Sequence, residues 1–177
     1  MALEIERRFL VAGQDWLPLV RWRARLRQGY LVSGSDGLTV RVRLSEAEAW
    51  LTLKALPPGG SDALTRLEFE YRIPLADGEA LLALSERRLE KCRHGLDLPG
   101  GDWVVDVFEG ANAPLVVAEV EIGAPDQPLV VPPWCVRELS GRHEWSNAAL
   151  AARPLAYRSE AERQLLLAGL PPAEPVG

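Results

Sequence analysis

Charged side chains occupy alternate positions in the first ten residues, MALEIERRFL. Glu4, Glu6 and Arg8 share one parity, and mostly apolar residues occupy the other. Successive side chains of a β-strand point to opposite faces, so a strand here would carry two carboxylates and a guanidinium on one face. Carboxylate oxygens suit hard divalent cations, and a guanidinium fork suits phosphate oxygens. The segment therefore has the chemistry to bind a metal ion and a phosphate group.

The same alternation returns along the chain in TRLEFEYRI, LTVRVRL, WLTLK, EKCRH, DWVVDVF and VVAEVEI. The charged residues on one parity of these segments are Arg41, Arg43, Lys54, Arg66, Glu68, Glu70, Arg72, Lys91, Arg93, Asp106, Glu119 and Glu121. An antiparallel sheet with one face in water also alternates, but such a face usually mixes in Ser, Thr and Gln. The almost purely ionic composition favours an enclosed polar interior.

An enclosed set of these charges would be nearly neutral. Together with Glu4, Glu6 and Arg8 it contains eight cations and seven anions, whereas the rest of the chain contains 12 cations and 18 anions. Removing an ion from water is costly unless the ion is paired or coordinated. Such a lining therefore implies a ligand, in which Arg and Lys would meet phosphate oxygens and surplus carboxylates would meet divalent cations.

Eight strands would position these groups. The alternation, together with the turn-forming clusters SGSDG, PPGG and PGG, predicts strands at residues 3–11, 25–32, 38–44, 49–55, 66–73, 87–94, 102–109 and 115–122. The connections are too short for parallel crossovers, so most strand pairs should be antiparallel. Eight strands can close into a barrel in which either face points inward.

Helices are expected around this barrel. We predict one at residues 76–86 with Asp77 as its N-cap, and two more at 146–153 and 159–169, each capped by a serine. Residues 171–177 should be frayed. The expected fold class is α+β, mainly β, with an eight-stranded antiparallel closed barrel and a few short peripheral and C-terminal helices. We expect one domain, with the tunnel barrel in residues 1–155 and the C-terminal helix and tail in residues 156–177.

The composition argues against several classes of partner. The 177 residues are 47% hydrophobic, carry a net charge of −5 and have a pI near 5.2, which disfavours nucleic acid and anionic membrane surfaces. Cys92 and Cys135 lack the spacing of a metal or redox motif and should be free thiols. No apolar run reaches 18 residues and no signal-peptide pattern opens the chain, so we expect a cytoplasmic protein.

Several segments of the chain resemble those of a known protein family. EIERRFLV, RQGYL, TVRVRL, LTLK, RLEFEY, EKCR, VVDVFEG and VAEVEI are similar, in order, to segments of the short prokaryotic CYTH proteins, the triphosphate tunnel metalloenzymes, over residues 3–152. The opening signature of that family is Glu-x-Glu-x-Lys. The resemblance implies an eight-stranded tunnel that holds a triphosphate and a divalent metal, Mg²⁺ or Mn²⁺, with two ions expected. Members hydrolyse inorganic or thiamine triphosphate, and a related branch cyclises ATP.

The resemblance also implies roles for individual residues. Metal ligands would be Glu4, Glu6, Glu68, Glu70, Asp106, Glu119 and Glu121. Groups that bind the substrate phosphates would be Arg8, Arg41, Arg43, Lys54, Arg66, Lys91, Arg93 and His143. Lys91, Tyr30 and Arg8 would take part in catalysis, the first two by assisting the attack of water. Phosphoryl transfer needs mainly positioning and charge neutralisation, which such groups supply.

Two positions depart from the family pattern. Arg8 stands where lysine is usual, which keeps the positive charge but replaces a compact ammonium with a bulkier guanidinium. The stretch SGRHEWSN differs from the usual Thr-x-Asp-Lys-Arg-Tyr-Ser-Asn, and Arg142 or His143 would replace the missing lysine. The Gly-rich SGSDG lacks the context of a P-loop and is interpreted as a turn.

The expected function is metal-dependent hydrolysis of a triphosphate, with inorganic triphosphate as the first substrate and diphosphate and phosphate as products. The alternatives are a thiamine or nucleoside triphosphatase, an adenylyl cyclase of the CYTH type, and a non-catalytic tunnel that binds polyphosphate or nucleotide. The partner would be a small-molecule triphosphate, with neither nucleic acid nor membrane involved. A homodimer is left open, as are the physiological substrate and the pathway.

Overall fold

The computed structural model describes residues 3–34, 37–59 and 64–167, and within them nine strands form one antiparallel sheet. The strands are β1 (Leu3–Val11), β2 (Val20–Ser33), β3 (Thr39–Leu44), β4 (Ala49–Ala55), β5 (Thr65–Ile73), β6 (Arg88–Leu96), β7 (Asp102–Phe108), β8 (Val116–Glu121) and β9 (Cys135–Glu138). The helices are α1 (Leu75–Leu84), α2 (Asn147–Ala152) and α3 (Glu160–Leu167), with short 3-10 turns η1 (Leu17–Leu19), η2 (Gly110–Asn112), η3 (His143–Trp145) and η4 (Leu155–Tyr157).

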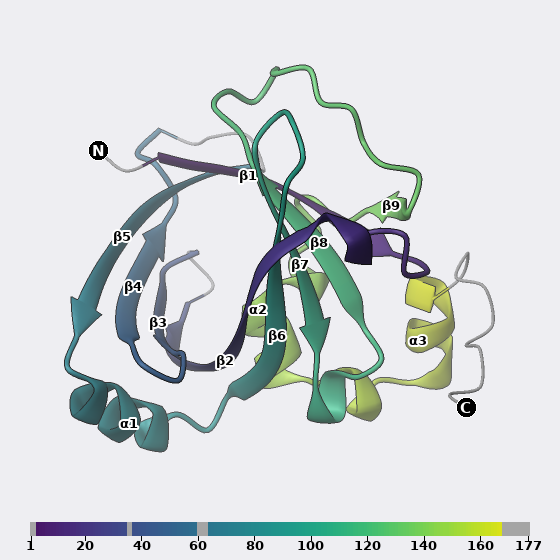
Figure 1. The fold of residues 1–177 in the computed structure, drawn as a ribbon. Helices are drawn as coiled ribbons and strands as arrows, with labels where there is room; N and C mark the ends of the chain where they lie inside the picture. Colours follow the sequence, from purple (N-terminus) through teal and green to yellow (C-terminus); the bar gives the residue numbers. More distant parts are fainter. Residues whose placement is uncertain (1–2, 35–36, 60–63, 168–177) are drawn as a thin grey trace.

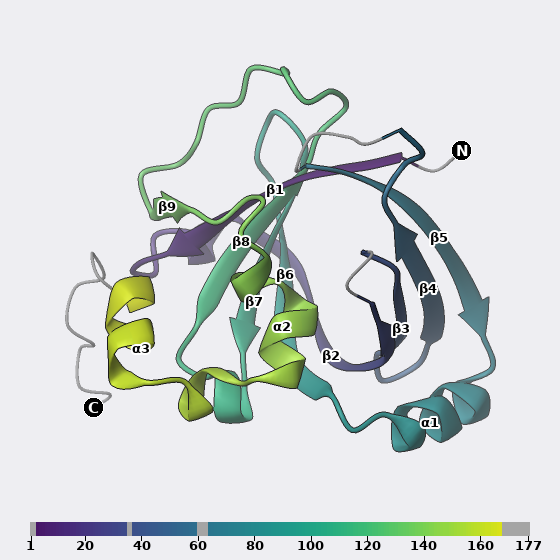
Figure 2. The same ribbon diagram turned by 180° about the vertical axis from the view of Figure 1, so that it is seen from behind.

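Eight of these strands close into a ring (Figures 1 and 2). The order β5-β4-β3-β2-β6-β7-β8-β1 returns to its start because β1 also pairs with β5, where Leu3 faces Leu67 and Ile5 faces Thr65. The second half of β1 pairs with β8 along one edge and with β9 along the other. The predicted closed antiparallel barrel is therefore confirmed, with β9 added at the outside of the ring.

The predicted strands agree well with the observed ones except at β2. Strands β1 and β4 have the predicted bounds, and five others differ from them by no more than two residues at either end. Strand β2 begins at Val20 rather than at residue 25, because Val20 to Ala24 pair with β6 as far as Leu96. Strand β9 was not predicted, since four residues after a proline-rich stretch are too few to display an alternation.

The structure contains the predicted helices, but the predicted N-cap of the first one is wrong. Pro74, not Asp77, is the N-cap of α1, and Asp77 lies in the first turn. Ser146 caps α2 as predicted, since its Oγ accepts a hydrogen bond from the Ala149 N–H at 3.1 Å. Residues 168–177, which include the end of the predicted third helix and the expected frayed tail, lie outside the described residues.

The apolar sides of the strands face outward and pack beneath covering segments. Phe9, Trp103, Val105 and Val120 belong to one core cluster, which the loop before β9 helps to cover through Trp134. Helix α1 covers the lower ends of β3 and β4 and packs Leu82 against them (Figure 1). Within the described ranges, no helix is long and apolar enough to cross a membrane.

The inner face of the ring is charged in one part and apolar in the other. At one end, side chains of the inward parity become apolar and include Leu10, Leu89, Phe108 and Val117. They form a second core cluster with Leu150 of α2 and with other residues that follow β9. Helix α2 packs against β6 and β2 at this end of the barrel, so the C-terminal part of the chain closes it off.

We expect Gly101→Ala to destabilise the barrel at the junction of β7 and β8. A Cβ added to Gly101 would lie 2.3 Å from the carbonyl oxygen of Glu121 and 2.8 Å from Cγ2 of Val120. A backbone oxygen cannot yield without disturbing the strand pairing, so the free energy of unfolding should fall by about 1–3 kcal/mol in a denaturant titration. Gly123→Ala is the matched control, because its Cβ would meet only the flexible Gln127 side chain, at 3.3 Å. Equal losses in the two variants would contradict this account.

Candidate functional site

The charged half of the barrel encloses a cavity of about 900 Å³. Side chains from seven of the eight ring strands line it, together with residues of the segment that follows β9 and of α2. Among the described residues, the charged lining groups are seven cations and six carboxylates, together with His143: Arg8, Arg41, Arg43, Lys54, Arg66, Arg93, Arg142, Glu4, Glu6, Glu68, Glu70, Glu119 and Glu121. The inward orientation of the ionic faces, inferred from composition, therefore agrees with the structure.

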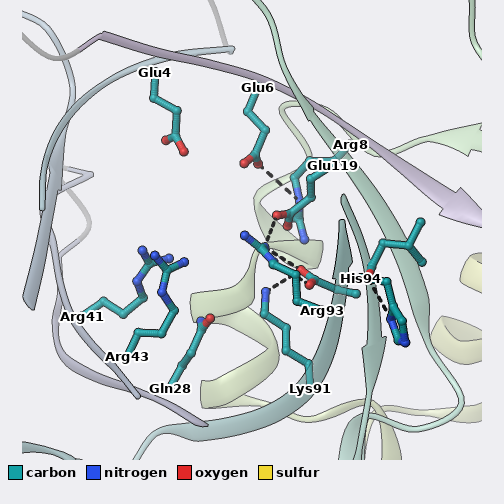
Figure 3. Close-up of polar contacts among 12 residues, drawn as sticks. Glu4, Glu6, Arg8, Gln28, Arg41, Arg43, Lys91, Arg93, His94 and Glu119 are labelled. Atoms are coloured by element: carbon teal, nitrogen blue, oxygen red, sulfur yellow. Dashed lines mark hydrogen bonds and ion pairs between the residues drawn. The ribbon is translucent and has the colours of Figure 1, made fainter. Parts of the chain in front are cut away.

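Carboxylates gather on one side of this cavity. Glu4 and Glu6 project from β1 toward the interior (Figure 3), and Glu121 lies beside Glu6 in the β1–β8 pairing. Lys54 reaches across from β4 to donate to Glu4, and its ammonium is 3.6 Å from Glu68. The carboxylates on this side therefore outnumber the basic groups that pair with them.

Burial and mutual repulsion raise the pKa values of this acidic group. Burial, followed by the negative charges of Glu119 and Glu4, raises the pKa of Glu6 to about 8. Burial also raises the pKa of Glu4, against the opposing effect of Lys54. The pKa of Glu121 is raised by burial and then by Glu4. Side chains that raise one another's pKa in this way form a site where added positive charge would be favourable.

Basic groups dominate the opposite wall. The Arg41 and Arg43 guanidinium groups both reach Glu70, at 3.2 and 3.0 Å, and Thr52 donates to the same carboxylate at 2.8 Å. Burial and then repulsion from Arg41 and Arg93 lower the pKa of Arg43 to about 10. Arg41 retains a buried Nε–H without a hydrogen-bond partner in the structure. This wall therefore has donors and positive charge in excess of what Glu70 satisfies.

A compact ion-pair network lies between these two walls (Figure 3). Arg93 donates to both oxygens of Asp106 at 2.8 Å and to Glu119 at 2.5 Å, and Arg8 donates from Nε to Glu119 at 3.1 Å. The Lys91 ammonium donates to Asp106 at 2.5 Å. Because both oxygens of Asp106 already accept hydrogen bonds from bases, Asp106 holds Arg93 and Lys91 in place.

The same network sets the protonation of its members. Burial opposes ionisation of Glu119, but the positive charges of Lys91 and Arg93 hold its pKa well below the usual range. Arg93 and Lys91 likewise outweigh burial and lower the pKa of Asp106. Burial lowers the pKa of Lys91 to about 8, although Asp106 favours its charged form. Burial raises the pKa of Tyr30, whose hydroxyl oxygen accepts a hydrogen bond from Gln28 at 3.2 Å.

Two similar proteins identify the kind of molecule that has this cavity. No family model matches the sequence. An inorganic triphosphatase of Acetivibrio thermocellus is 37% identical over 158 residues, which span 87% of this chain and 96% of the relative. An inorganic triphosphatase of Nitrosomonas europaea is 39% identical over 153 residues, which span 84% of this chain and 96% of the relative. The chain belongs to the CYTH-type inorganic triphosphatases.

Solved structures agree with this CYTH-type assignment. The crystal structure of an inorganic triphosphatase superposes with a TM-score of 0.60 at 35% identity, over 85% of this chain and 95% of that one. A Hippeastrum protein, named a putative adenylyl cyclase with a dominant triphosphatase activity, superposes with a TM-score of 0.51 at 16% identity, over 70% of this chain and 81% of that one. At that identity the second comparison supports the shared fold.

Most site residues predicted from the sequence of this CYTH-type protein lie in the cavity wall. They are Glu4, Glu6, Arg8, Tyr30, Arg41, Arg43, Lys54, Arg66, Glu68, Glu70, Arg93, Glu119, Glu121 and His143. Lys91 and Asp106 lie outside that wall, with fully buried side chains paired to each other. Arg72, which was counted among the enclosed charges, is largely exposed and pairs with Glu48. The roles assigned to these residues stay predictions.

Uncharged residues in the wall of the CYTH-type cavity and directly behind it were missed by sequence reasoning. Thr52 and Gln28 are fully buried on the inward parity of β4 and β2, where the search for charge passed over them. Asn147 lines the cavity from α2, and its Oδ1 is buried without a hydrogen-bond partner. The alternation along β4 and β2 could have assigned Thr52 and Gln28 to the interior of the barrel. Asn147 lies on no strand, so no alternation in the sequence indicated its position.

The carboxylate side of the cavity has the donor chemistry of a metal site. Carboxylate oxygens are ligands that suit Mg²⁺ and Mn²⁺, and burial, followed by repulsion from neighbouring carboxylates, raises the pKa values of Glu4, Glu6 and Glu121. Within the described ranges, no three acidic, histidine or cysteine side chains are grouped closely enough to hold a metal by themselves. A metal ion held by these carboxylates would therefore need further ligands.

Glu6 predicts an unusual dependence of stability on pH in the metal-free protein. Because its pKa is about 8 in the folded state and near 4.5 otherwise, the folded state binds more protons between these pH values, and stability should fall as pH rises through them. Glu6→Gln removes this cost. With the Glu6 side chain 27% exposed, we expect the variant to be about 1–2 kcal/mol more stable than wild type at pH 9, with little difference at pH 5.

Thermal melts in the presence of a chelator would measure this effect, with about 2–4 °C expected per kcal/mol. Glu138→Gln is the control, because hydrogen bonding to Arg7 lowers the pKa of Glu138 and stabilises the charged form. Its substitution should therefore cost more stability at pH 9 than at low pH. A Glu6→Gln variant that loses stability at pH 9 would contradict the assignment of a raised pKa.

Proposed function

We propose that this protein hydrolyses inorganic triphosphate to diphosphate and phosphate in a divalent-metal-dependent reaction. The observation that carries the proposal is the cavity itself, where a guanidinium-rich wall faces a group of carboxylates with raised pKa values. A polyphosphate chain with its metal ions has the complementary arrangement of charge. The relatives named inorganic triphosphatase support the same activity.

The basic wall would bind the phosphate oxygens. Arg41 and Arg43 lie side by side on β3, and Arg93 and Arg66 extend the positive lining. Arg41 Nε and Arg8 Nη2 are buried N–H groups without hydrogen-bond partners. Unsatisfied buried donors are costly, and the oxygens of an anionic ligand would relieve that cost once the side chains adjust. These groups would also stabilise the negative charge that shifts onto the leaving diphosphate.

Glu4, Glu6, Glu119 and Glu121 would hold the metal ions, for which we propose Mg²⁺ or Mn²⁺. When bound, the metal would supply Lewis-acid neutralisation of phosphate charge and would lower the pKa of a water molecule. Glu6 must lose its proton to act as a ligand, so metal binding should strengthen as pH rises toward 8. Glu119 is already ionised, because the bases of the ion-pair network hold its pKa low.

Lys91 and Asp106 would act from beneath the cavity wall. Their ion pair is fully buried, and Asp106 also fixes the guanidinium of Arg93, which does line the cavity. We propose that this pair orients Arg93 toward the substrate. Tyr30 faces the cavity with a neutral hydroxyl, since burial raises its pKa, and could therefore donate a hydrogen bond to a phosphate oxygen or a water molecule.

An inorganic substrate suits this lining better than a nucleotide or thiamine ester. In the described part of the wall, Tyr30 is the single Phe, Tyr or Trp residue, and it is 6% exposed. Recognition of a purine or thiazolium ring usually uses an accessible aromatic face or an apolar pocket. The wall instead offers charge along most of its length. We also propose a cytoplasmic location, in keeping with the composition of the chain.

Phosphate release from a panel of triphosphates would test the function. Purified protein with Mg²⁺ or Mn²⁺ should release phosphate from inorganic triphosphate faster than from ATP or thiamine triphosphate, and a chelator should abolish the release. Absence of turnover with every substrate, combined with tight binding of triphosphate in calorimetry, would favour a binding protein instead. A cyclic product from ATP would support a cyclase.

Glu4→Gln should reduce turnover by about 10²–10³-fold, the loss typical when one preorganised electrostatic group is removed. The glutamine keeps the size of the side chain but lacks the charge that a metal ligand provides. Steady-state kinetics with varied Mg²⁺ would measure the change, and the metal concentration for half-maximal rate should rise. Glu79→Gln is the control, since Glu79 is a surface acid paired with Arg27. Wild-type kinetics in Glu4→Gln would exclude Glu4 as a metal ligand.

A further inference from the structure

We propose that Arg8 and Arg158 are positioning residues that clamp η3 between them and so fix one wall of the cavity. This inference rests on the proposed function for its kinetic consequences, while its structural part can be measured without substrate. The wall in question contains His143, Ser146 and Asn147, all of which line the cavity. The two arginines come from parts of the chain that are far apart in sequence, since Arg8 lies in β1 and Arg158 is the C-cap of η4.

Arg8 reaches the segment from within the barrel. Its Nη1 donates to the carbonyl oxygen of Trp145 at 2.8 Å, while its Nε donates to Glu119 at 3.1 Å. The backbone of Arg8 is also tied to the chain just before η3, because its N–H donates to Ser140 Oγ at 2.9 Å and its carbonyl accepts from the Leu139 N–H at 2.7 Å. Arg8 therefore holds the chain both just before η3 and at the last residue of η3.

Arg158 reaches the segment from the end of η4. Its Nη2 donates to the carbonyl oxygen of Glu144 at 2.7 Å, and its Nε donates to the carbonyl oxygen of Arg153 at 3.1 Å. Its guanidinium lies over the Trp145 ring, 4.3 Å from the ring centroid. Arg158 is 8% exposed and does not line the cavity. The carbonyls of two consecutive residues thus each accept a hydrogen bond from a different guanidinium.

Local structure alone would hold this wall poorly. The three-residue turn η3 has no side-chain cap at its N-terminus, and α2 has six residues. Isolated helices of this length are unstable in water. Carbonyls at the end of a helical turn lack partners within it, and hydrogen bonds from cations satisfy them well. The clamp therefore supplies order that the sequence of the segment does not.

The clamp also accounts for arginine at position 8, where the family signature has lysine. A guanidinium presents separate nitrogens in a fixed fork, so Arg8 can donate to Glu119 from Nε and to the Trp145 carbonyl from Nη1. An ammonium has one nitrogen and cannot span the two acceptors in this way. Arg8 thus connects the ion-pair network of the cavity directly to its C-terminal wall.

Arg158→Met tests the clamp without changing a residue of the cavity wall. In the substrate-free protein, hydrogen exchange at the backbone amides of residues 143–150 should accelerate about tenfold, the size expected for loss of a hydrogen bond from a charged donor. The KM for inorganic triphosphate should rise about tenfold while kcat stays within about twofold, because the wall would bind substrate less well without altering the chemistry. Arg158→Lys should restore part of both effects.

Arg153→Met is the matched control, because Arg153 is exposed on the same stretch and its side chain pairs with Glu162. It should leave exchange at residues 143–150 and the kinetics unchanged. Arg8→Lys should accelerate exchange at the same amides as Arg158→Met, and the double variant should accelerate it by less than the product of the two single effects. Circular dichroism and thermal melts would confirm that each variant is folded.

Unchanged exchange at residues 143–150 in Arg158→Met would overturn the clamp. Faster exchange with an unchanged KM would overturn its positioning role, and a fall in kcat at constant KM would do the same. If wild-type protein released no phosphate from triphosphate, the proposed function would fail, and the exchange data for Arg8→Lys and Arg158→Met would by themselves decide whether the clamp exists.

Discussion

The enclosure of charge is the constraint on which the rest of the structure depends. In a closed ring, the side chains that point inward reach bulk water only through the cavity. Every ionised group among them therefore needs a partner. The ion-pair network of Arg8, Glu119, Arg93, Asp106 and Lys91 satisfies this need at the centre of the barrel. At the edges of the network the balance is incomplete, with acids in excess on one wall and bases in excess on the other. That incomplete balance gives the cavity its capacity to bind a charged ligand.

The walls of the cavity are held by different means. On the strand side, hydrogen bonds between neighbouring strands fix the position of each inward side chain, and the register sets which charges meet. On the C-terminal side, a 3-10 turn and a helix of six residues form the wall, and side-chain contacts to backbone carbonyls take over the role that strand pairing has elsewhere. Arg8 belongs to both systems, since it pairs with Glu119 and donates to the segment that leads into α2.

The sequence predicted the strands and the inward charge because both follow from a local period of two. Residues such as Glu4, Arg41 and Glu119 could be assigned to the cavity from parity alone, once the ring was assumed to be closed. Depth within the barrel could not be predicted in the same way, so Lys91 and Asp106 were expected in the cavity wall although they lie beneath it. The early start of β2, the pairing of β9 and the wall that contains Asn147 all depend on contacts between residues far apart in the chain. No local pattern encodes such contacts.

Strand β1 is synthesised before every strand with which it pairs. Its neighbours β8 and β9 lie more than 100 residues further along, and β5 is needed to seal the ring on the other edge. During synthesis, a strand with Glu4, Glu6 and Arg8 on one face and apolar residues on the other must therefore wait without a sheet to join. Closure of the barrel therefore depends on pairing between residues that are far apart in the chain, and contacts of this kind form slowly because a long loop must close first.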